Sequence, residues 1–369
     1  MSSKERAIDI VRDLAIYNEE FSLDVSHGLM RLAADHRPHG PLIKQKIFEY
    51  EEKKPEPFYM DNRTRVGLYI GKSEMGKLHH EGKKLKARQG YVRSEVNAFS
   101  VKTSDQAVTV GSYVEDMTDF LKACAKDEDS VLVKFGDKAL DKAEKMLGPV
   151  FVKSRPIGGH GVVLKLNKFR HWRGLSPSDY FLWGEKDSGV VWRGQPTGTH
   201  VNRSLSWDDN VRLNFVKRYS KNHDVGFSKL GPQGVRVCEP YVKGFTAKKE
   251  QLKSKYIVSL EGNDVATNLK WVLASNSVPI MPRPTFESWL LESQLIPYVH
   301  YVPLSDDLDD LDEVYEWCLN NDDHCRQIAE NGKRYMRMFL DEENEKEIFR
   351  MIYSEYKKIV GLEHDKSVA

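Results

Sequence analysis

The chain has 369 residues, 40% of them hydrophobic and 10% aromatic, a composition that excludes disordered, collagen-like and coiled-coil proteins and predicts two domains. Because 56 Lys and Arg residues nearly balance 55 Asp and Glu residues, no overall charge favours nucleic acid or an anionic membrane as the partner. No apolar run reaches the roughly 20 residues that span a bilayer, and the N-terminus has no signal-peptide core, so we expect a cytoplasmic protein.

The first 125 residues are predicted to be largely helical. Apolar positions recur at helical spacing over residues 4–20, and another helix is expected at 113–125. Between them, a stretch with several prolines is predicted to be loop with one short strand at 47–50. Residues 72–88 hold six Lys or Arg against two Glu. This segment is interpreted either as a solvated loop or as a surface that contacts an anionic acceptor or attaches the protein peripherally to a membrane.

From residue 130 onwards, β-rich runs alternate with helical patterns, which predicts βα units around mostly parallel sheets. A first series has strands at 130–135, 150–153 and 161–166 and a helix at 138–147. A second series has strands at 189–194, 224–227, 256–260, 277–281 and 298–302, with helices at 207–219, 264–275 and 285–293. Three helices follow at 307–320, 322–338 and 342–360, the middle one interrupted by Gly332.

The predicted fold class is therefore α/β, with two Rossmann-like series that divide between about residues 168 and 188. Ligands of such sheets bind at the carboxyl ends of the strands, so the segments that follow the strands are the first place to look for a site.

The most informative of these segments follows the strand that begins at Lys255 and Tyr256. The strand leads into a turn at Gly262, and small polar residues then open a helix that Asn263 or Asp264 could cap. Free backbone N–H groups and the positive end of a helix dipole suit a diphosphate. The alternative is an ordinary βα turn, because neither a GxGxxG nor a Walker pattern is present.

A second segment, residues 191–203, follows the strand that ends at Trp192-Arg-Gly194. It supplies hydroxyl groups and the arginines Arg193 and Arg203. Because the guanidinium fork matches two phosphate oxygens at once, this loop is a candidate phosphate site. The alternative is a surface loop with solvated arginines.

A third candidate is Asp137, which comes just after the apolar run that ends at Phe135. A carboxylate at the end of a buried strand can serve as a general base. The alternative is that Asp137 caps the helix expected at 138–147.

Other motifs carry less weight. The run Gly158-Gly-His-Gly161 could flank a substrate or form a flexible turn. Asp307 and Asp309 have the DxD spacing of metal-dependent sugar transferases, but they also fit the start of a helix, where acidic residues favour the dipole. The four cysteines and twelve histidines show no metal-ligand spacing, so we expect neither a disulfide framework nor a metal site.

The favoured segments occur together and in this order in glycosyltransferase family 90, which the chain resembles from about residue 130 to 340. The family includes protein O-glucosyltransferases of Notch-type repeats, fungal capsule-associated xylosyltransferases and bacterial lipopolysaccharide-modifying enzymes. The resemblance rests on Trp192-Arg-Gly with Arg203, Lys255-Tyr256 followed by Gly262 to Asn268, Pro297 to Pro303 with Asp307-Leu308, and Ile328-Ala-Glu-Asn-Gly332. The stretches Leu260 to Ala266 and Pro284 to Leu290 resemble the bacterial members more closely.

The resemblance implies a GT-B-like fold with two Rossmann-like domains that face a central cleft, crossed by C-terminal helices. The expected parts are an acceptor-side domain at 1–175, a UDP-sugar-binding domain at 176–340 and a C-terminal helix and tail at 341–369 that pack back on the first domain. The implied activity is inverting, metal-independent transfer of glucose or xylose from a UDP-sugar to a hydroxyl of a glycan, such as lipopolysaccharide. No cofactor is expected besides this co-substrate.

The resemblance also assigns residues. Asp137 is the implied catalytic base, and the implied acceptor-side residues are Lys153, Ser154, Arg155 and His160. The implied donor-binding residues are Arg193, Gln195, Thr197, Arg203, Lys255, Gly262, Asn263, Asp264, Val265, Ala266, Thr267 and Asn268. The animal enzymes have Phe-Arg-Gly where this chain has Leu260-Glu-Gly262, and an arginine where it has Asn268. Diphosphate neutralisation is therefore left to Arg203, with Arg193 or Lys255.

Two other functions stay open at this point. A degenerate transferase could bind a UDP-sugar without turnover, as a sensor or scaffold. The Rossmann-like pattern would also suit a dinucleotide-dependent oxidoreductase, although the missing GxGxxG counts against it.

Overall fold

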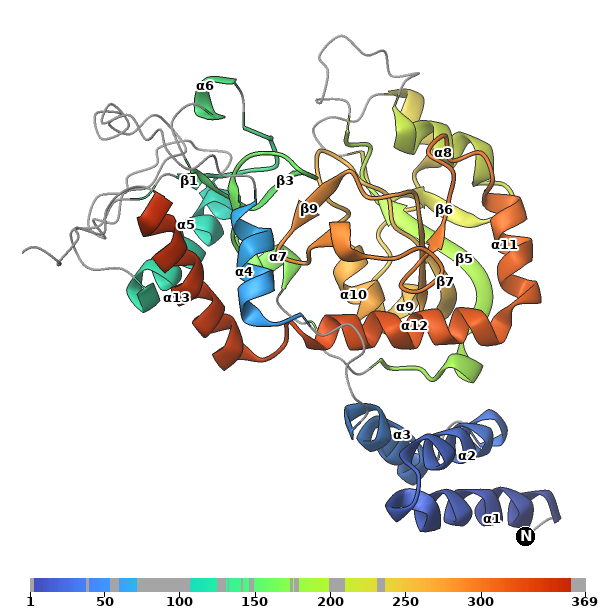
Figure 1. The fold of residues 1–369 in the computed structure, drawn as a ribbon. Coiled ribbons are helices and arrows are strands. Elements are labelled where there is room, and N and C mark those ends of the chain that lie inside the picture. The colour runs from blue at the N-terminus through green and yellow to red at the C-terminus, as the bar shows by residue number, and fades with distance from the viewer. Residues whose placement is uncertain are drawn as a thin grey trace, which may run out of the picture.

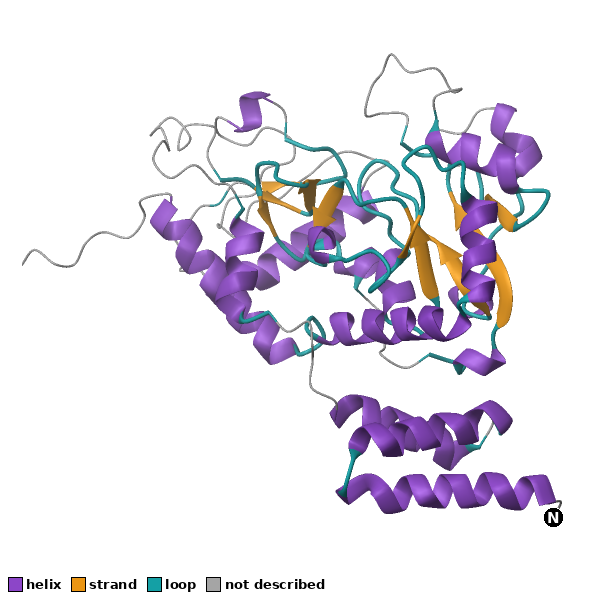
Figure 2. Ribbon diagram, turned by 45° about the vertical axis from the view of Figure 1, so that its right-hand side comes forward, coloured by secondary structure: helices purple, strands orange, loops and turns teal. Residues whose placement is uncertain are grey.

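A computed structural model describes residues 3–37, 40–53, 60–71, 107–124, 131, 133–140, 142–145, 149–172, 175, 179–198, 210–230 and 236–359. The described strands form a three-stranded sheet, a five-stranded sheet and a two-stranded pair, and helices cover the sheets (Figures 1 and 2). Both larger sheets are parallel, which confirms the predicted α/β class. The segment 72–88 lies outside the described residues.

The N-terminal helices form a unit with its own core, which lies below the rest of the molecule in Figure 1. They are α1 (Ser3–Tyr17), the 3-10 helix η1 (Asn18–Glu20), α2 (Leu23–His36) and α3 (Pro41–Lys53). The strand predicted at 47–50 is wrong, because these residues belong to α3. Ile43, Ile47 and Tyr50 are all buried, and their spacing of four and three residues places them on one side of a helix.

The smaller sheet has the strand order β1-β2-β4. The elements in this part of the chain are α4 (Asn62–Ile70), α5 (Ala107–Cys124), β1 (Val133–Lys134), α6 (Lys142–Lys145), β2 (Phe151–Val152), β3 (Ser154–Pro156), which lies outside this sheet, β4 (Val162–Val163) and α7 (Lys168–His171). The strands predicted at 130–135, 150–153 and 161–166 are confirmed, although each is shorter than expected. The helix predicted at 138–147 is confirmed only in part, because residues 138–140 are not helical and α6 begins at Lys142.

The larger sheet has the order β10-β8-β7-β5-β6. Its strands are β5 (Asp187–Gly194), β6 (Asp224–Phe227), β7 (Ser254–Val258), β8 (Val278–Met281) and β10 (Val302–Pro303). The helices in this part of the chain are η3 (Trp183–Glu185), α8 (Val211–Tyr219), η6 (Arg236–Tyr241), α9 (Lys248–Gln251), α10 (Leu269–Leu273), η7 (Glu292–Gln294), α11 (Leu311–Asn320), α12 (Asp322–Arg337) and α13 (Glu342–Ile359), the last of which packs on the smaller sheet instead. The apolar stretches of β7 and β8 are buried, as in a parallel sheet covered on both faces.

Two further predictions need correction. The helix expected at 285–293 is instead β9 (Phe286–Ser288) and η7, and β9 pairs antiparallel with β3. The tertiary pairing overrides the helical pattern, because the Glu287 carboxylate lies 2.8 Å from the buried Arg155 guanidinium. Gly332 does not interrupt α12. A Cβ atom there would lie 3.1 Å from the Leu273 side chain, so this glycine lets α12 approach α10 closely.

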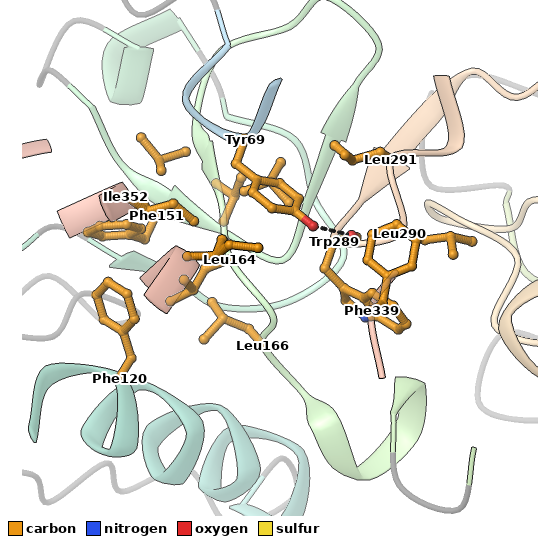
Figure 3. Close-up of a cluster of buried hydrophobic side chains, with 14 of the residues drawn as sticks. Tyr69, Phe120, Phe151, Leu164, Leu166, Trp289, Leu290, Leu291, Phe339 and Ile352 are labelled. Atoms are coloured by element: carbon orange, nitrogen blue, oxygen red, sulfur yellow. Dashed lines mark hydrogen bonds between the residues drawn. The ribbon is translucent and has the colours of Figure 1, made fainter. Parts of the chain in front are cut away.

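One hydrophobic core joins both halves of the chain. Figure 3 shows Phe120, Phe151 and Leu164 in one cluster with Trp289 and Phe339, which come from far later in the sequence. The Tyr69 hydroxyl donates a hydrogen bond of 2.7 Å to the Trp289 carbonyl in the same cluster.

The C-terminal helix α13 packs on α4 and α5. Its Phe349 ring lies 5.5 Å from Phe120, and its Tyr356 ring stacks at 4.7 Å on Phe151. The end of the described chain therefore belongs to the core of the smaller sheet. Among the helices described, none combines the length and apolarity that crossing a membrane requires.

Candidate active site

Three segments meet at the carboxyl edge of the larger sheet, because β8, β7 and β5 are neighbours and run in the same direction. They are residues 259–268 after β7, residues 195–198 after β5 and residues 282–285 after β8. This is the edge at which parallel sheets bind ligands.

Arg212, in the first turn of α8, ties two of these segments together. Its guanidinium donates to the carbonyls of Leu260 at 2.6 Å and Glu261 at 3.0 Å on one side. On the other side it donates to the Gln195 carbonyl at 2.9 Å and the Thr197 hydroxyl at 2.8 Å. Within the described part of the chain Arg212 forms no ion pair, and burial lowers the pKa of its guanidinium to about 10. The cation therefore stays charged at neutral pH while its described hydrogen bonds are to neutral oxygens.

Sequence reasoning missed Arg212. It stands inside the helix predicted at 207–219, where an arginine most often points to solvent. The one available signal was its position in the first turn of a helix that follows a loop rich in Gly and Thr.

Two glycines let the segments after β5 and β7 touch. A Cβ atom on Gly262 would lie 2.4 Å from the Thr197 hydroxyl and 2.9 Å from the Arg212 guanidinium. Gly198 has φ +103°, a conformation that side chains rarely adopt, and lies against the Gly262 carbonyl. Any side chain at Gly262 would push these segments apart.

Polar side chains complete this arrangement. The Asn263 Oδ1 atom accepts a hydrogen bond of 3.1 Å from the Gly198 backbone N–H. The Glu261 carboxylate accepts from the backbone N–H groups of Thr285 and Phe286, each at 3.0 Å. Burial raises the pKa of Glu261. The Glu in Leu260-Glu-Gly262, which departs from the animal enzymes, therefore holds the segment after β8.

The expected helix start at Asn263 or Asp264 is wrong. α10 begins at Leu269, so residues 262–268 form an irregular turn rather than the first turn of a helix. The Asn268 side chain donates to the Val258 carbonyl at 2.8 Å and closes the turn on its own strand. Val265 and Ala266 are buried, whereas Thr267 is partly exposed.

A buried lysine joins this turn to the smaller sheet. Lys153, between β2 and β3, lies with its Nζ atom 2.7 Å from an Asp264 carboxylate oxygen and within hydrogen-bond distance of Asp137. The Ser154 hydroxyl donates to the same Asp264 carboxylate at 2.5 Å. The structure thus brings together four residues that sequence analysis assigned to different roles.

The two carboxylates of this cluster have different environments. Burial raises the pKa of Asp137, but the positive charge of Lys153 and its hydrogen bond outweigh burial, so the pKa lies below its ordinary value. Deeper burial dominates at Asp264 and raises its pKa. Burial lowers the pKa of Lys153, but the carboxylates outweigh it and raise that pKa. Asp137 is therefore ionised at neutral pH and partly exposed, with 28% of its side chain accessible. The interpretation of Asp137 as a helix cap is wrong, because α6 begins five residues later.

Several predicted site residues lie apart from this cluster. Arg193 binds the Asp224 carboxylate at 2.7 Å, and Lys255, near the amino end of β7, binds Asp322 at 2.6 Å. All five N–H groups of Arg155 are used by Glu287 and by the carbonyls of Leu68, Tyr69 and Gly161, which leaves none for an acceptor.

His160 is exposed in the turn between β3 and β4. Arg203 lies outside the described residues.

The DxD motif lies in the loop before α11. The Asp309 carboxylate accepts a hydrogen bond of 2.8 Å from the Ser305 hydroxyl, and Asp310 accepts at 3.0 Å from the Ser305 backbone N–H. These acids close a turn ahead of the helix. Over the described ranges, no group of three or more His, Cys, Asp or Glu side chains could hold a metal ion.

The sequence pattern of the family described as Glycosyl transferase family 90 matches residues 176–367, more than half of the chain. The chain belongs to glycosyltransferase family 90. The matched region contains the larger sheet with the turn at 259–268 and the loop at 195–198, and it extends to α12 and α13. The predicted family is therefore confirmed.

Proteins similar to this chain include the O-glucosyltransferase LpsA of Dichelobacter nodosus, 39% identical over 201 residues, which cover 53% of this chain and 58% of that protein. Protein O-glucosyltransferase 2 of Danio rerio is 32% identical over 88 residues, 24% of this chain and 17% of the relative. Protein O-glucosyltransferase 1 of Homo sapiens is 27% identical over 114 residues, 30% of this chain and 28% of the relative. The chain thus spans little more than half of LpsA and less than a third of the two animal proteins.

Proposed function

We propose that this protein is an inverting glycosyltransferase that moves glucose from UDP-glucose to a hydroxyl group of a glycan. The observation that carries the proposal is the contact of Lys153 with both Asp137 and Asp264. Through this one ammonium group, a candidate base on the smaller sheet lies next to the turn of the larger sheet that would hold the donor.

The proposed donor site is the carboxyl edge of the larger sheet. Backbone N–H groups of the turn at 262–268 would face the diphosphate, and Arg212 would add positive charge beneath it. Arg203 is proposed to bind the diphosphate directly through its guanidinium fork. Arg193 and Lys255 are not proposed to bind the donor, because each forms an ion pair with a carboxylate away from this edge.

The proposed reaction is a single displacement. Asp137 takes the proton of the acceptor hydroxyl while that oxygen bonds to the anomeric carbon from the side opposite the diphosphate. The bond between the anomeric carbon and the diphosphate oxygen breaks, and UDP leaves with its electron pair. Positive charge and oriented N–H groups at the donor turn stabilise the charge that grows on UDP.

The acceptor is proposed to be a glycan of the lipopolysaccharide type, which enters beside Asp137. Of the acceptor-side residues, Lys153 and Ser154 lie at the cluster, and His160 lies on the exposed turn nearby in the sequence. LpsA is named an O-glucosyltransferase, which favours glucose over xylose as the donated sugar.

We further propose that the two parallel sheets are the two halves of a GT-B arrangement, with the cleft between the Asp137 side and the donor turn. The antiparallel pairing of β3 with β9 and the passage of α13 onto α4 and α5 support a connection between the halves close to this cleft.

The proposal is tested with UDP-glucose, UDP-xylose and free UDP in a thermal-shift assay, followed by UDP release in the presence of truncated lipopolysaccharide cores. Stabilisation by UDP-glucose together with acceptor-dependent UDP release supports the enzyme. Stabilisation without release by any core would favour a non-catalytic UDP-sugar-binding protein instead.

A further inference from the structure

α1 exposes a continuous apolar stripe on the side that faces away from α2. The four side chains are between 46% and 71% exposed, and we call them the α1 stripe: Ile10, Leu14 and Tyr17 on α1, and Phe21 directly after η1, which follows α1. Spacings of four and three residues place the first three on one side of α1. Phe21 joins them because its ring lies against that of Tyr17. The other side buries Ile8 and Ala15 in the core shared with α2 and α3. α1 therefore has two apolar faces, of which the described structure covers one.

The stripe is large and continuous for a surface feature. The Tyr17 and Phe21 rings lie 5.6 Å apart, so the aromatic end forms one patch with Leu14 one turn before it. Contiguous exposed apolar surface of this kind marks a contact with another molecule. Figure 1 shows α1 at the outer end of the N-terminal unit, with α2 and α3 between it and the sheets. A partner bound there would leave the proposed active site open.

Charge argues against a membrane as the partner. Three Lys or Arg residues and five Asp or Glu residues lie between positions 3 and 21, so this segment is net negative. Helices that lie in a membrane surface instead carry Lys and Arg on their polar face, which attracts anionic lipid. The stripe therefore fits a protein better than a lipid surface.

The pattern of the stripe is self-complementary. Its members are arranged symmetrically about Leu14: Ile10 and Tyr17 lie four before and three after it, and Phe21 lies seven after it. Ala7, seven before Leu14, is also exposed. When two copies of α1 pair antiparallel, Leu14 meets Leu14, Ile10 meets Tyr17, and the small Ala7 leaves room for Phe21. This is the geometry of a two-fold interface, in which one patch contacts itself.

Charges along one edge of the stripe favour the antiparallel orientation. Arg6 and Asp13 on α1 are seven residues apart and so follow the same edge, and Glu20 in η1 continues that edge seven residues further on. A two-fold antiparallel pair places these equal edges side by side, with Arg6 against Glu20 of the second copy at both ends. Neither residue takes part in an ion pair within the described ranges, whereas the central Asp13 is already paired with Arg12 at 2.7 Å. A parallel pair would instead bring Arg6 near Lys4.

We propose that the α1 stripe is the contact surface of a homodimer, formed by antiparallel pairing of α1 with α1 of a second copy of this chain. This inference goes beyond the proposed transfer reaction and does not depend on it.

Sedimentation equilibrium of the full chain over a concentration series tests the proposal. We expect a dimer. Leu14→Glu, which places two carboxylates at the two-fold axis, should raise the dissociation constant by about 100-fold or more. Phe245→Glu is the matched control, because Phe245 is an 84% exposed aromatic residue outside α1. This control should leave the dimer intact, and circular dichroism should show an unchanged helix content in both variants.

Charge reversal tests the orientation. Arg6→Glu and Glu20→Arg should each weaken the dimer by about 2–10-fold, because each breaks two exposed ion pairs per dimer. The double variant should restore the original affinity. The proposal is overturned by a chain that stays monomeric at all concentrations, by a dimer that Leu14→Glu leaves intact, or by a double variant that is weaker than either single one. Sedimentation with anionic vesicles that Leu14→Glu abolishes would also overturn it in favour of a membrane contact.

Discussion

The Nζ atom of Lys153 lies 2.7 Å from a carboxylate oxygen of Asp264, across the boundary between the two parallel sheets. Both groups are buried, with 2% and 7% of their side chains exposed. An ion pair removed from water is stable when each charge has further partners, and here Asp137 and Ser154 supply them. The contact thus fixes the distance between the proposed base and the proposed donor turn.

Replacement of Lys153 should change the pH dependence of transfer. Asp137 accepts a proton only when ionised, and Lys153 lowers its pKa. In Lys153→Met the pKa of Asp137 should rise, so the acid limb of the kcat/KM profile should move to higher pH. A profile recorded from pH 4 to 9 checks this. Lys138→Met, which removes the exposed lysine next to Asp137, should leave the acid limb in place.

The same Lys153→Met substitution should also lower stability, by about 3–5 kcal/mol, because it leaves the buried Asp264 carboxylate without its cation. Asp264 determines how this loss of stability depends on pH. Because its pKa is raised in the folded protein, the folded state binds more protons than the unfolded state, so the free energy of unfolding of the variant should increase as pH falls. Denaturant unfolding at pH 5 and pH 8 measures this. Equal losses at both pH values would contradict the assignment.

Gly262→Ala should disrupt the donor turn. The new methyl group would meet the Thr197 hydroxyl and the Arg212 guanidinium, which four hydrogen bonds hold in place. We expect a loss of about 1–3 kcal/mol in the free energy of unfolding, typical of overpacking, and weaker UDP binding by calorimetry. Gly189→Ala is the control, because its Cβ has no atom within 4 Å, and it should change neither quantity. Unchanged UDP affinity in Gly262→Ala would place the donor elsewhere.

The arginines after β5 should differ in their effect on the donor. Arg203→Ala should weaken UDP binding by about 1.5–3 kcal/mol, the range for a hydrogen bond to a charged group. Arg193→Ala should leave UDP affinity as it is, because Arg193 is bound to Asp224. Calorimetric titration of both variants with UDP decides this. If UDP affinity fell only in Arg193→Ala, the diphosphate would bind Arg193 rather than Arg203, contrary to the proposal.

Chelation should leave transfer intact. Asp309 of the DxD motif and the neighbouring Asp310 close the turn before α11, and Asn can take over the role of Asp309. Activity in EDTA, and activity of the Asp307→Asn/Asp309→Asn variant, should therefore lie close to that of the untreated protein. Loss of activity in EDTA with recovery on addition of manganese would show that the motif binds a metal and would contradict the proposed mechanism.

Sequence analysis predicted the features that depend on local pattern. Continuous apolar runs predict buried strands such as Tyr256 to Val258 and Val278 to Ile280, and the alternation of these strands with helices predicts parallel sheets. The family was predicted from motifs that stand at the ends of those strands, and the family match at 176–367 confirms it.

The features that sequence analysis missed depend on contacts between distant residues. β9 looked helical, and only its pairing with β3, more than 120 residues earlier, makes it a strand. The bonds of Arg212 to segments around positions 195 and 261 have no local signature. Arg155 and Lys153 stand two residues apart and were both assigned to the acceptor, but tertiary packing alone separates the fully bonded Arg155 from the Lys153 cluster.

The most direct test of the proposed mechanism is the rate of transfer by Asp137→Asn, measured beside its UDP affinity. Asn keeps the shape of the side chain and can still accept a hydrogen bond from Lys153, so folding and UDP binding should be unchanged. Because the amide is not a useful base, transfer should fall by about 10²–10⁴-fold. Transfer that persists near the original rate in a folded variant would remove Asp137 from the chemistry and contradict the proposed mechanism.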